Sequence, residues 1–315
     1  MSHPGCTLAA MLTPDQRADR LASRQYGLIT RDQALRAGLS PRQIEWRLAS
    51  GRWVLVARGL YRVAAVPVSW QQRALAPCLV GPAGTVVSNL TAAAVHDLTH
   101  APARPHVTVP SRANGRSHLA VVHRVDLGPR DRLQVAGVPC TSVARTLLDC
   151  AGIVGPARLA DLVDAAFCAA LSHTRAVAEA IDRAGPGPGR RHVDSLRLAI
   201  EIWTPGITPG SPAEMRLLRQ IRDWGFEPPK PQVAVFDDAG GFIGRVDLAW
   251  PRRRVGLEYD SDEHHNPRHW ERDEGRHPRY GDAGWRVHRV DKHDLRPGQA
   301  RLRQLLDAMF LRPVA

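Results

Sequence analysis

The chain has 315 residues, of which 43% are hydrophobic, so it is long and apolar enough to bury more than one core. Its formal net charge is +12, and residues 1–70 hold ten Lys and Arg against four Asp and Glu. This excess favours a phosphate backbone as partner. The sequence lacks an apolar run of membrane-spanning length and an N-terminal signal pattern, and its five cysteines form no CxxC pair. These features argue against a membrane protein, a disulfide framework and a zinc site, and they predict a cytoplasmic protein.

Three short helices are predicted near the N-terminus, over residues 14–25, 31–37 and 41–50. A Thr or Ser precedes each of them as an N-cap, and glycines follow the second and third. The apolar segment 52–63 then turns at Arg58–Gly59 and predicts a β-hairpin. Helices in this order, followed by a hairpin, are typical of a winged helix, which we place at residues 13–70.

In a winged helix the third helix enters the major groove and the hairpin contacts the backbone. Ile44 and Leu48 are spaced to face the core, with Trp46 near the boundary. The predicted DNA contacts are Arg42, Gln43, Arg47 and the further candidate Glu45 for the bases, and Arg52, Arg58 and Arg62 for the phosphates. The alternative is that these arginines form a solvated face of a small helical domain.

The segment GLITRDQALRAGLSPRQIEWRLASGRW, followed by RGLYRV, resembles the N-terminal domain of AbiEi-type antitoxins from abortive-infection toxin–antitoxin systems. In those proteins this domain binds promoter DNA. The stretch TSVARTLLD, which follows a Gly-Val-Pro turn, resembles their middle region. The resemblance implies double-stranded DNA as a partner and raises a toxin encoded nearby as a second one.

The rest of the chain is divided by composition. Residues 71–185 predict a middle α+β region whose scattered histidines lack metal-ligand spacing. A Gly-Pro repeat and a short helix make residues 186–210 a linker, and residues 211–315 form the last domain.

The last domain contains GRVDLAWPRRRVGLEYDSDEHH, which predicts two strands and a turn over residues 244–265. Asp247 lies on the first strand and Glu258 ends the second, so the two carboxylates can converge, with His264 on the exit loop. Glu214 is the third residue of the helix capped by Ser211, where it either completes the capping box or joins the same site. Clustered carboxylates and an imidazole in a basic protein suggest Mg²⁺-assisted phosphodiester hydrolysis.

This pattern resembles the PD-(D/E)xK nuclease fold. The later elements WERD, Arg276 and GWRV resemble the very-short-patch-repair (Vsr) type endonucleases. The resemblance implies Mg²⁺ held by Asp247, Glu258 and Glu214. It further implies His264 as general base, and Asp273 and Arg276 within the site, with the arginine near the scissile phosphate. Two departures are visible: Asp260 replaces the Lys expected two residues after Glu258, and His277–Pro278 is predicted to interrupt the helix that starts at 267–274.

The predicted fold class is a multidomain α+β protein: a winged helix, a middle α/β region and a restriction-endonuclease-like α/β/α domain. One functional hypothesis is a DNA-binding protein with a metal-dependent endonuclease domain, in phage defence or DNA repair. The alternative is a non-catalytic, antitoxin-like transcriptional regulator with a degenerate nuclease fold. In a third, structural interpretation, Asp247 and Glu258 only pair with Arg245 and Arg254 across the strands.

Overall fold

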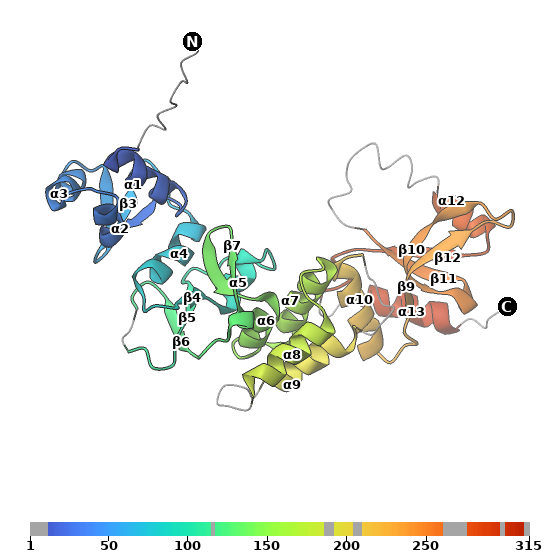
Figure 1. The fold of residues 1–315 in the computed structure, drawn as a ribbon. Helices are drawn as coiled ribbons and strands as arrows, with labels where there is room; N and C mark the ends of the chain where they lie inside the picture. The colour runs from blue at the N-terminus through green and yellow to red at the C-terminus, as the bar shows by residue number, and fades with distance from the viewer. Residues whose placement is uncertain are drawn as a thin grey trace, which may run out of the picture. The chain divides into compact units, whose positions relative to one another are not determined.

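The computed structural model describes residues 12–114, 117–185, 192–203, 210–260, 276–296 and 300–311. The protein is of the mixed α+β class, and its described strands form three sheets (Figure 1). Two compact units are present, and they are described separately. Unit 1 contains Met1–Val154 with Glu179–Arg191, and unit 2 contains Gly155–Ala178 with His192–Ala315. Within the described ranges, no helix is both long enough and apolar enough to cross a membrane.

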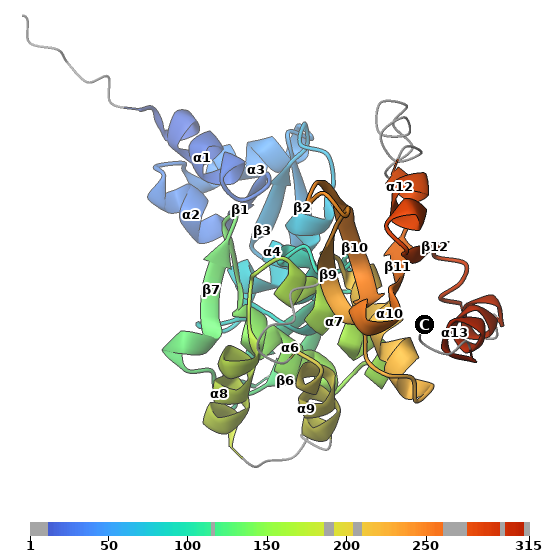
Figure 2. The same ribbon diagram turned by 90° about the vertical axis from the view of Figure 1, so that its right-hand side faces the viewer.

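The first part of unit 1 is a winged helix (Figure 2). Its elements are α1 (Pro14–Ser23), β1 (Leu28–Thr30), α2 (Arg31–Arg36), α3 (Pro41–Ala49), β2 (Trp53–Ala57) and β3 (Leu60–Val63). The strands form an antiparallel sheet in the order β1-β3-β2. The helices and the hairpin confirm the sequence prediction. Residues 28–30, for which no strand was predicted, form the third strand of the sheet.

Local sequence explains where these helices begin. Thr13, Thr30 and Ser40 each accept a hydrogen bond from a Gln backbone N–H three residues later, and that Gln side chain accepts one in return from the cap N–H. The helices pack on a core that includes Ile29, Ile44, Trp53 and Tyr61. The Trp53 and Tyr61 rings stack with their centroids 5.6 Å apart.

The remainder of unit 1 surrounds a five-stranded sheet in the order β6-β5-β4-β8-β7. Its elements are α4 (Trp70–Val80), β4 (Val86–Val87), α5 (Asn89–Val95), β5 (His106–Val109), β6 (Val121–Arg124), the 3-10 turn η1 (Pro129–Asp131), β7 (Arg132–Val135), β8 (Val138–Thr141) and α6 (Val143–Ala151). The β4–β8 and β5–β6 pairs are parallel, and the β4–β5 and β7–β8 pairs are antiparallel.

The winged helix shares a core with this second part. Leu28 and Leu60 pack with Leu75 of α4 in one buried cluster. The Gln72 amide donates to the Tyr26 carbonyl at 2.7 Å, and the Tyr26 hydroxyl donates to the Ala136 carbonyl at 2.6 Å. The boundary expected near residue 70 therefore does not separate two independent cores.

Unit 2 contains a four-stranded sheet in the order β12-β11-β10-β9. The β11–β12 pair is parallel, and the β10–β11 and β9–β10 pairs are antiparallel. Its elements are α7 (Pro156–Cys168), α9 (Val193–Glu201), α10 (Pro212–Asp223), β9 (Lys230–Phe236), β10 (Phe242–Trp250), the 3-10 turn η2 (Pro251–Arg253), β11 (Val255–Tyr259), α12 (Arg276–Asp282), β12 (Arg286–Val290) and α13 (Arg301–Leu311). The helix α8 (Thr174–Ala184) contains one of the divisions between the units.

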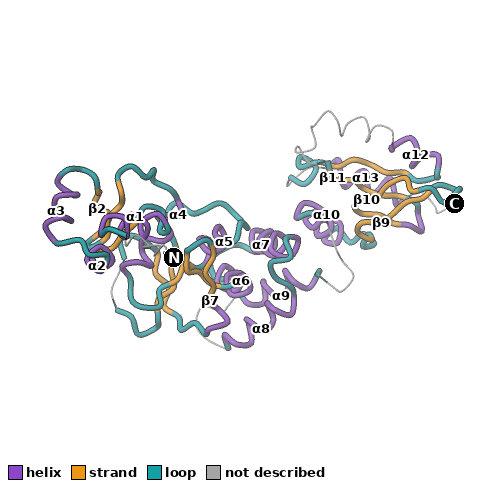
Figure 3. The backbone as a smooth tube through the Cα atoms, turned by 45° about the horizontal axis from the view of Figure 1, so that its top comes forward, coloured by secondary structure: helices purple, strands orange, loops and turns teal. Residues whose placement is uncertain are grey.

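Apolar residues on α10 and α13 build the main core of unit 2. Leu217 and Ile221 from α10 and Leu306 from α13 are fully buried against Leu248 and Leu257 of the sheet. Figure 3 shows β9, β10 and β11 together, with α10 beside them. A separate buried cluster joins strand residues such as Val246 to Tyr280 of α12.

The boundaries between the two compact units fall at other residues than the predicted domain boundaries at 185 and 210. The helix α7, expected in the middle region, packs on α9 and α10. Its Asp164 is fully buried and accepts from both Arg219 of α10, at 2.6 and 3.2 Å, and the Trp203 indole, at 2.9 Å. These contacts assign α7 to the last unit.

Pro278 lies within α12, and its predicted interruption of a preceding helix stays a prediction. It is the third residue of α12, which begins at Arg276. The first turn of a helix has no intrahelical acceptor for its N–H groups, so a proline is tolerated there. The helix start expected at 267–274 lies outside the described residues.

Candidate nucleic-acid interface

The exposed face of α3 is defined by helical periodicity. Arg42, Glu45 and Trp46 are exposed, whereas Ile44 is only 2% exposed and lies in the core. Trp46 is 52% exposed, and the guanidinium carbon of Arg52 lies 5.1 Å from its ring centroid. An aromatic ring and an arginine thus stand together on the outer face of the winged helix. The sequence prediction placed Trp46 only at the boundary, although its spacing from Arg42 already puts both residues on one side of a helix.

The prediction that Arg47 faces the bases is wrong. Its side chain is buried, 9% exposed, because it is three residues after Ile44 and shares that inward face. The guanidinium pairs with Asp15 of α1, donates to the Gln43 carbonyl at 2.8 Å and lies 5.6 Å from the Trp53 ring centroid. Arg47 therefore holds α3 to α1 and to the sheet.

Gln43 is exposed, but its side chain is already engaged. The Gln43 Oε1 atom accepts from the Ser40 N–H at 2.8 Å in the capping box. The amide NH₂ remains available on the exposed surface. A base contact from this residue would thus be made by a side chain fixed in position by the helix cap.

The three arginines predicted to contact phosphates differ in their exposure. Arg52 and Arg58 are exposed, and Arg58 occupies the β2–β3 turn. Arg62 is half-buried, and its Nη1 donates to the carbonyls of Val63, Ala64 and Val66 at 3.4, 3.2 and 2.6 Å. Arg62 therefore fixes the chain that leaves the hairpin, and the expectation that it points to a phosphate is corrected.

The described hydrogen bonds of the two predicted strand carboxylates of unit 2 come from different donors. Asp247 on β10 accepts from the Tyr259 N–H at 2.8 Å and from the Gln232 amide at 3.1 Å. Glu258 on β11 accepts from the Tyr280 hydroxyl at 3.0 Å, and its other oxygen lies 3.9 Å from the His277 Nε2.

Glu214 is linked to Asp247 through one amide group. The Gln232 Nε2 atom donates to Glu214 at 2.8 Å as well as to Asp247. Glu214 also accepts from the Gly210 N–H and the Ser211 hydroxyl at 2.8 and 3.0 Å, and it is 5% exposed. Burial raises the pKa of Glu214, and the nearby Asp247 charge raises it further. Glu214 is thus held at the start of α10 by Gly210 and Ser211, and it lies near the second carboxylate. The sequence prediction left out Gln232, which no acid-base or metal-ligand pattern singles out.

The remaining predicted site residues contribute less to the described geometry. Asp260 is exposed, and its backbone N–H donates to the Val290 carbonyl at 2.8 Å. His264 and Asp273 lie outside the described residues, and Arg276 begins α12 with a side chain that is not described.

The Gln232 amide lies between Glu214 and Asp247 and donates a hydrogen bond to each of them. In the described part of the chain, no three His, Cys, Asp or Glu side chains are grouped closely enough to hold a metal ion. The Mg²⁺ site stays a prediction for this chain.

Comparison with known proteins agrees with the N-terminal geometry. Residues 16–64 match the family described as "Transcriptional regulator, AbiEi antitoxin". The matched segment runs from α1 to the residue after β3, so it coincides with the winged helix.

Relatives over a longer stretch are uncharacterised mycobacterial proteins. The chain is 31% identical over 186 residues to the uncharacterized proteins MT2308 and Rv2248 of two Mycobacterium tuberculosis strains. The match covers 56% of this chain, and the chain spans 65% of the length of these relatives. Among solved structures, the RV2827C protein from Mycobacterium tuberculosis is similar at a TM-score of 0.40 and 16% identity, covering 72% of this chain and 89% of that chain.

Proposed function

We propose that this protein is a DNA-binding transcriptional regulator of the antitoxin type, which binds double-stranded DNA through α3 and the β2–β3 hairpin. The observation that carries the proposal is the coincidence of the regulator-family match with a complete winged helix. Three exposed arginines of that winged helix are placed where the DNA would lie: Arg42 on α3, Arg52 just before β2, and Arg58 in the hairpin turn. The antitoxin match makes a toxin encoded nearby the natural protein partner.

The exposed residues suggest a division of labour. Arg42 at the N-terminal end of α3 is placed to contact base edges, because winged helices insert this part of the helix into the major groove. Arg58 at the hairpin turn is placed to contact a phosphate, and Arg52 stacks on Trp46 between these two elements. The fixed position of Arg52 lowers the conformational entropy lost when it binds a phosphate.

For unit 2 we propose a restriction-endonuclease-like α/β/α fold that serves binding rather than catalysis. Its support is the four-stranded sheet with α10 and α13 in one buried cluster and α12 in another. Replacement of the family Lys by Asp260 and the Gln232 amide between two carboxylates both favour the non-catalytic alternative.

Metal-dependent endonuclease activity is the second candidate function. One observation favours it: Glu214 and Asp247 are close enough for the Asp247 charge to raise the pKa of Glu214, which a bound cation would relieve.

DNA binding is tested with the full chain and fluorescently labelled duplexes from the region upstream of its own gene. Binding is measured by anisotropy over a range of salt concentrations. We expect Arg52→Ala and Arg58→Ala each to weaken binding to all duplexes and to reduce the salt slope by about one unit. Arg42→Ala should instead reduce the preference for the upstream sequence, by about 1–3 kcal/mol at the contacted base pair.

Arg20→Ala is the matched control, since this exposed arginine lies on α1, outside α3 and the hairpin. It removes the same charge and should leave the affinity within about twofold of the wild type. Equal losses in Arg20→Ala and Arg58→Ala would refute the proposed interface and leave only nonspecific attraction to a basic protein.

The second candidate is tested with Mg²⁺ or Mn²⁺ and plasmid, nicked and mismatched duplex substrates. The regulator proposal expects no cleavage. Cleavage that is lost in the Asp247→Ala/Glu258→Ala variant would overturn the non-catalytic assignment of unit 2. Cleavage that persists in that variant would indicate a contaminating nuclease.

A further inference from the structure

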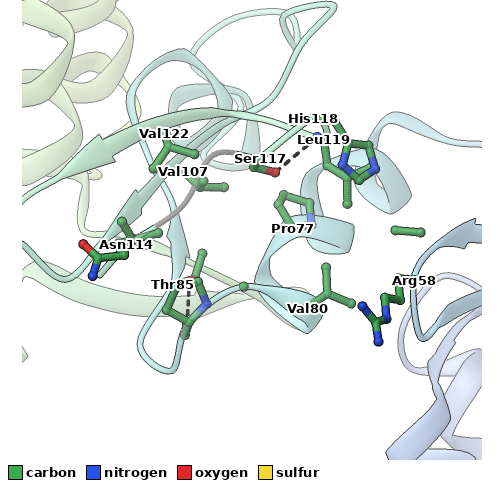
Figure 4. Close-up of a pocket in the computed structure, with 14 residues that line it drawn as sticks. Arg58, Pro77, Val80, Thr85, Val107, Asn114, Ser117, His118, Leu119 and Val122 are labelled. Atoms are coloured by element: carbon green, nitrogen blue, oxygen red, sulfur yellow. Dashed lines mark hydrogen bonds between the residues drawn. The ribbon is translucent and has the colours of Figure 1, made fainter. Parts of the chain in front are cut away.

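Unit 1 contains a pocket directly beneath the hairpin turn, here called the wing pocket. Its wall is formed by Ala57 and Arg58 of the hairpin, the C-terminal end of α4, and the strands β5 and β6 with the segment before β6 (Figure 4). Its volume is about 400 Å³, which lies in the range of small-molecule sites. The hairpin that is proposed to contact DNA thus forms one side of a cavity of ligand size.

The inner surface of the wing pocket is mostly apolar. Val107 and Val109 form a buried floor, at 1% and 5% exposure, and Pro77, Val80 and Leu119 form the sides. The Thr85 hydroxyl is directed to the Pro82 carbonyl at 2.6 Å, so this polar group is already satisfied. An occupant would therefore bury a hydrocarbon or aromatic body against these side chains.

The ionisable side chains described in the wing pocket are both basic. Arg58 and His118 line it, and its described lining residues include no Asp or Glu. Both side chains are exposed, and within the described part of the chain neither the hydrogen bonds nor the ion pairs include the Arg58 guanidinium. A guanidinium beside an apolar cavity without an acidic neighbour selects a negatively charged group on the occupant.

We propose that the wing pocket is an effector site for a small amphipathic monoanion, meaning an aliphatic or aromatic carboxylate whose apolar part fills the cavity. Its carboxylate pairs with Arg58, and the effector thereby weakens DNA binding. The second effect rests on the proposed function, because it assumes that Arg58 contacts a phosphate. One guanidinium serves both anions, so ligand and DNA exclude each other at this residue.

The position of the pocket supports this coupling. The hairpin residues Ala57 and Leu60 pack with Leu75 and Ala76 of α4 in one buried cluster, so the hairpin and the pocket wall belong to one packed body. A ligand that fills the cavity therefore lies against the backbone that sets the position of Arg58.

Ligand binding is tested on the full chain without DNA, using the fluorescence of anilinonaphthalene sulfonate, an aromatic monoanion. Decanoate and the neutral decanol then serve as competitors of equal chain length. We expect the dye to bind, decanoate to displace it, and decanol to be at least about tenfold weaker because it lacks the charge. Equal displacement by decanol would overturn the role of the anion.

Two filling variants locate the site. Val80→Trp acts from the end of α4, where Val80 is 40% exposed, and Val122→Trp acts from β6, where Val122 is half-buried. Both should lower the dye affinity at least tenfold. The control is Ile153→Trp, an exposed apolar residue of the same unit outside the pocket, which should bind the dye as the wild type does. Dye binding that is unchanged in both filling variants, or absent from the wild type, would refute the site.

The coupling to DNA is measured separately by anisotropy with upstream duplex. Saturating decanoate should weaken DNA binding by the wild type, whereas Val80→Trp should bind DNA like the wild type and not respond to decanoate. The protein could bind the dye in a way that depends on Val80 and yet bind no DNA. That result would support the ligand site and refute the proposed function. DNA binding by the wild type that does not respond to saturating decanoate would refute the coupling.

Discussion

The replacement of Arg47 by Met separates the two roles assigned to this residue. The sequence pattern predicts that Arg47 contacts bases, whereas the structure buries it between α1 and the sheet. Methionine keeps the length and most of the apolar packing of the side chain but removes the charge and the hydrogen bonds. We therefore expect Arg47→Met to reduce the stability of the winged helix and to change DNA recognition little at temperatures where the variant is folded.

The magnitude follows from the three contacts of the guanidinium. The ion pair with Asp15, whose side chain is 60% exposed, contributes about 0.2–1 kcal/mol. The hydrogen bond to the Gln43 carbonyl adds roughly 1–1.5 kcal/mol, and the contact with Trp53 adds about 0.5–1 kcal/mol. Together these contributions give an expected loss of about 2–3.5 kcal/mol in the free energy of unfolding.

The assay is urea denaturation followed by tryptophan fluorescence, with Arg42→Met as the matched control on the exposed face of α3. The control should lose less than about 0.5 kcal/mol of stability but should lose sequence preference for DNA. A variant Arg47→Met with wild-type stability and abolished DNA binding would show that Arg47 faces the DNA, and the described packing of α3 would be refuted.

Two further predictions concern unit 2. Arg219→Met should cost about 3–5 kcal/mol of unfolding free energy at neutral pH, because it leaves the fully buried Asp164 charge with only Trp203 as a hydrogen-bond donor among the described bonds. Burial raises the pKa of Asp164, so the stability lost in Arg219→Met should shrink as the pH falls and the carboxyl becomes protonated. The double variant Asp164→Asn/Arg219→Met should recover most of the lost stability. A loss in urea denaturation that is independent of pH would refute the buried charge. The variant Glu214→Gln tests the raised pKa of Glu214. The folded state binds the Glu214 proton more tightly than the unfolded state does, so the protonated carboxyl stabilises the fold. This stabilisation is present below the ordinary pKa of 4.5 and is lost as the pH rises through the pKa of the folded state. The stability of Glu214→Gln relative to the wild type should therefore increase with pH from about 4 to 8, and a relative stability that decreases with pH would contradict the assignment.

Local sequence was sufficient to place most elements of the winged helix. The three capping residues, Thr13, Thr30 and Ser40, set the helix starts, because a cap is satisfied by groups only three residues away. The turn at Arg58–Gly59 was likewise predictable, since Gly59 adopts a positive φ of 73° that suits glycine. The winged helix was recognisable from these elements and their order.

Contacts between distant residues decided the rest. The strand β1 is only three residues long and exists because it pairs with β3, about thirty residues later. Arg47 is buried although arginine is polar, because Trp53 and Asp15 give its stem and charge a partner on the inner face. A binary pattern of polar and apolar residues assigns such a side chain to the surface.

The candidate carboxylate site shows the same limit. The sequence determined that Asp247 and Glu258 lie on adjacent strands, because the alternating apolar residues and the turn at Pro251–Arg253 fix that hairpin. Only the tertiary structure decided what the carboxylates contact. Gln232 comes from a third strand and places its amide between Glu214 and Asp247, since the pairing of β9 with β10 brings a residue fifteen positions away within 3.1 Å.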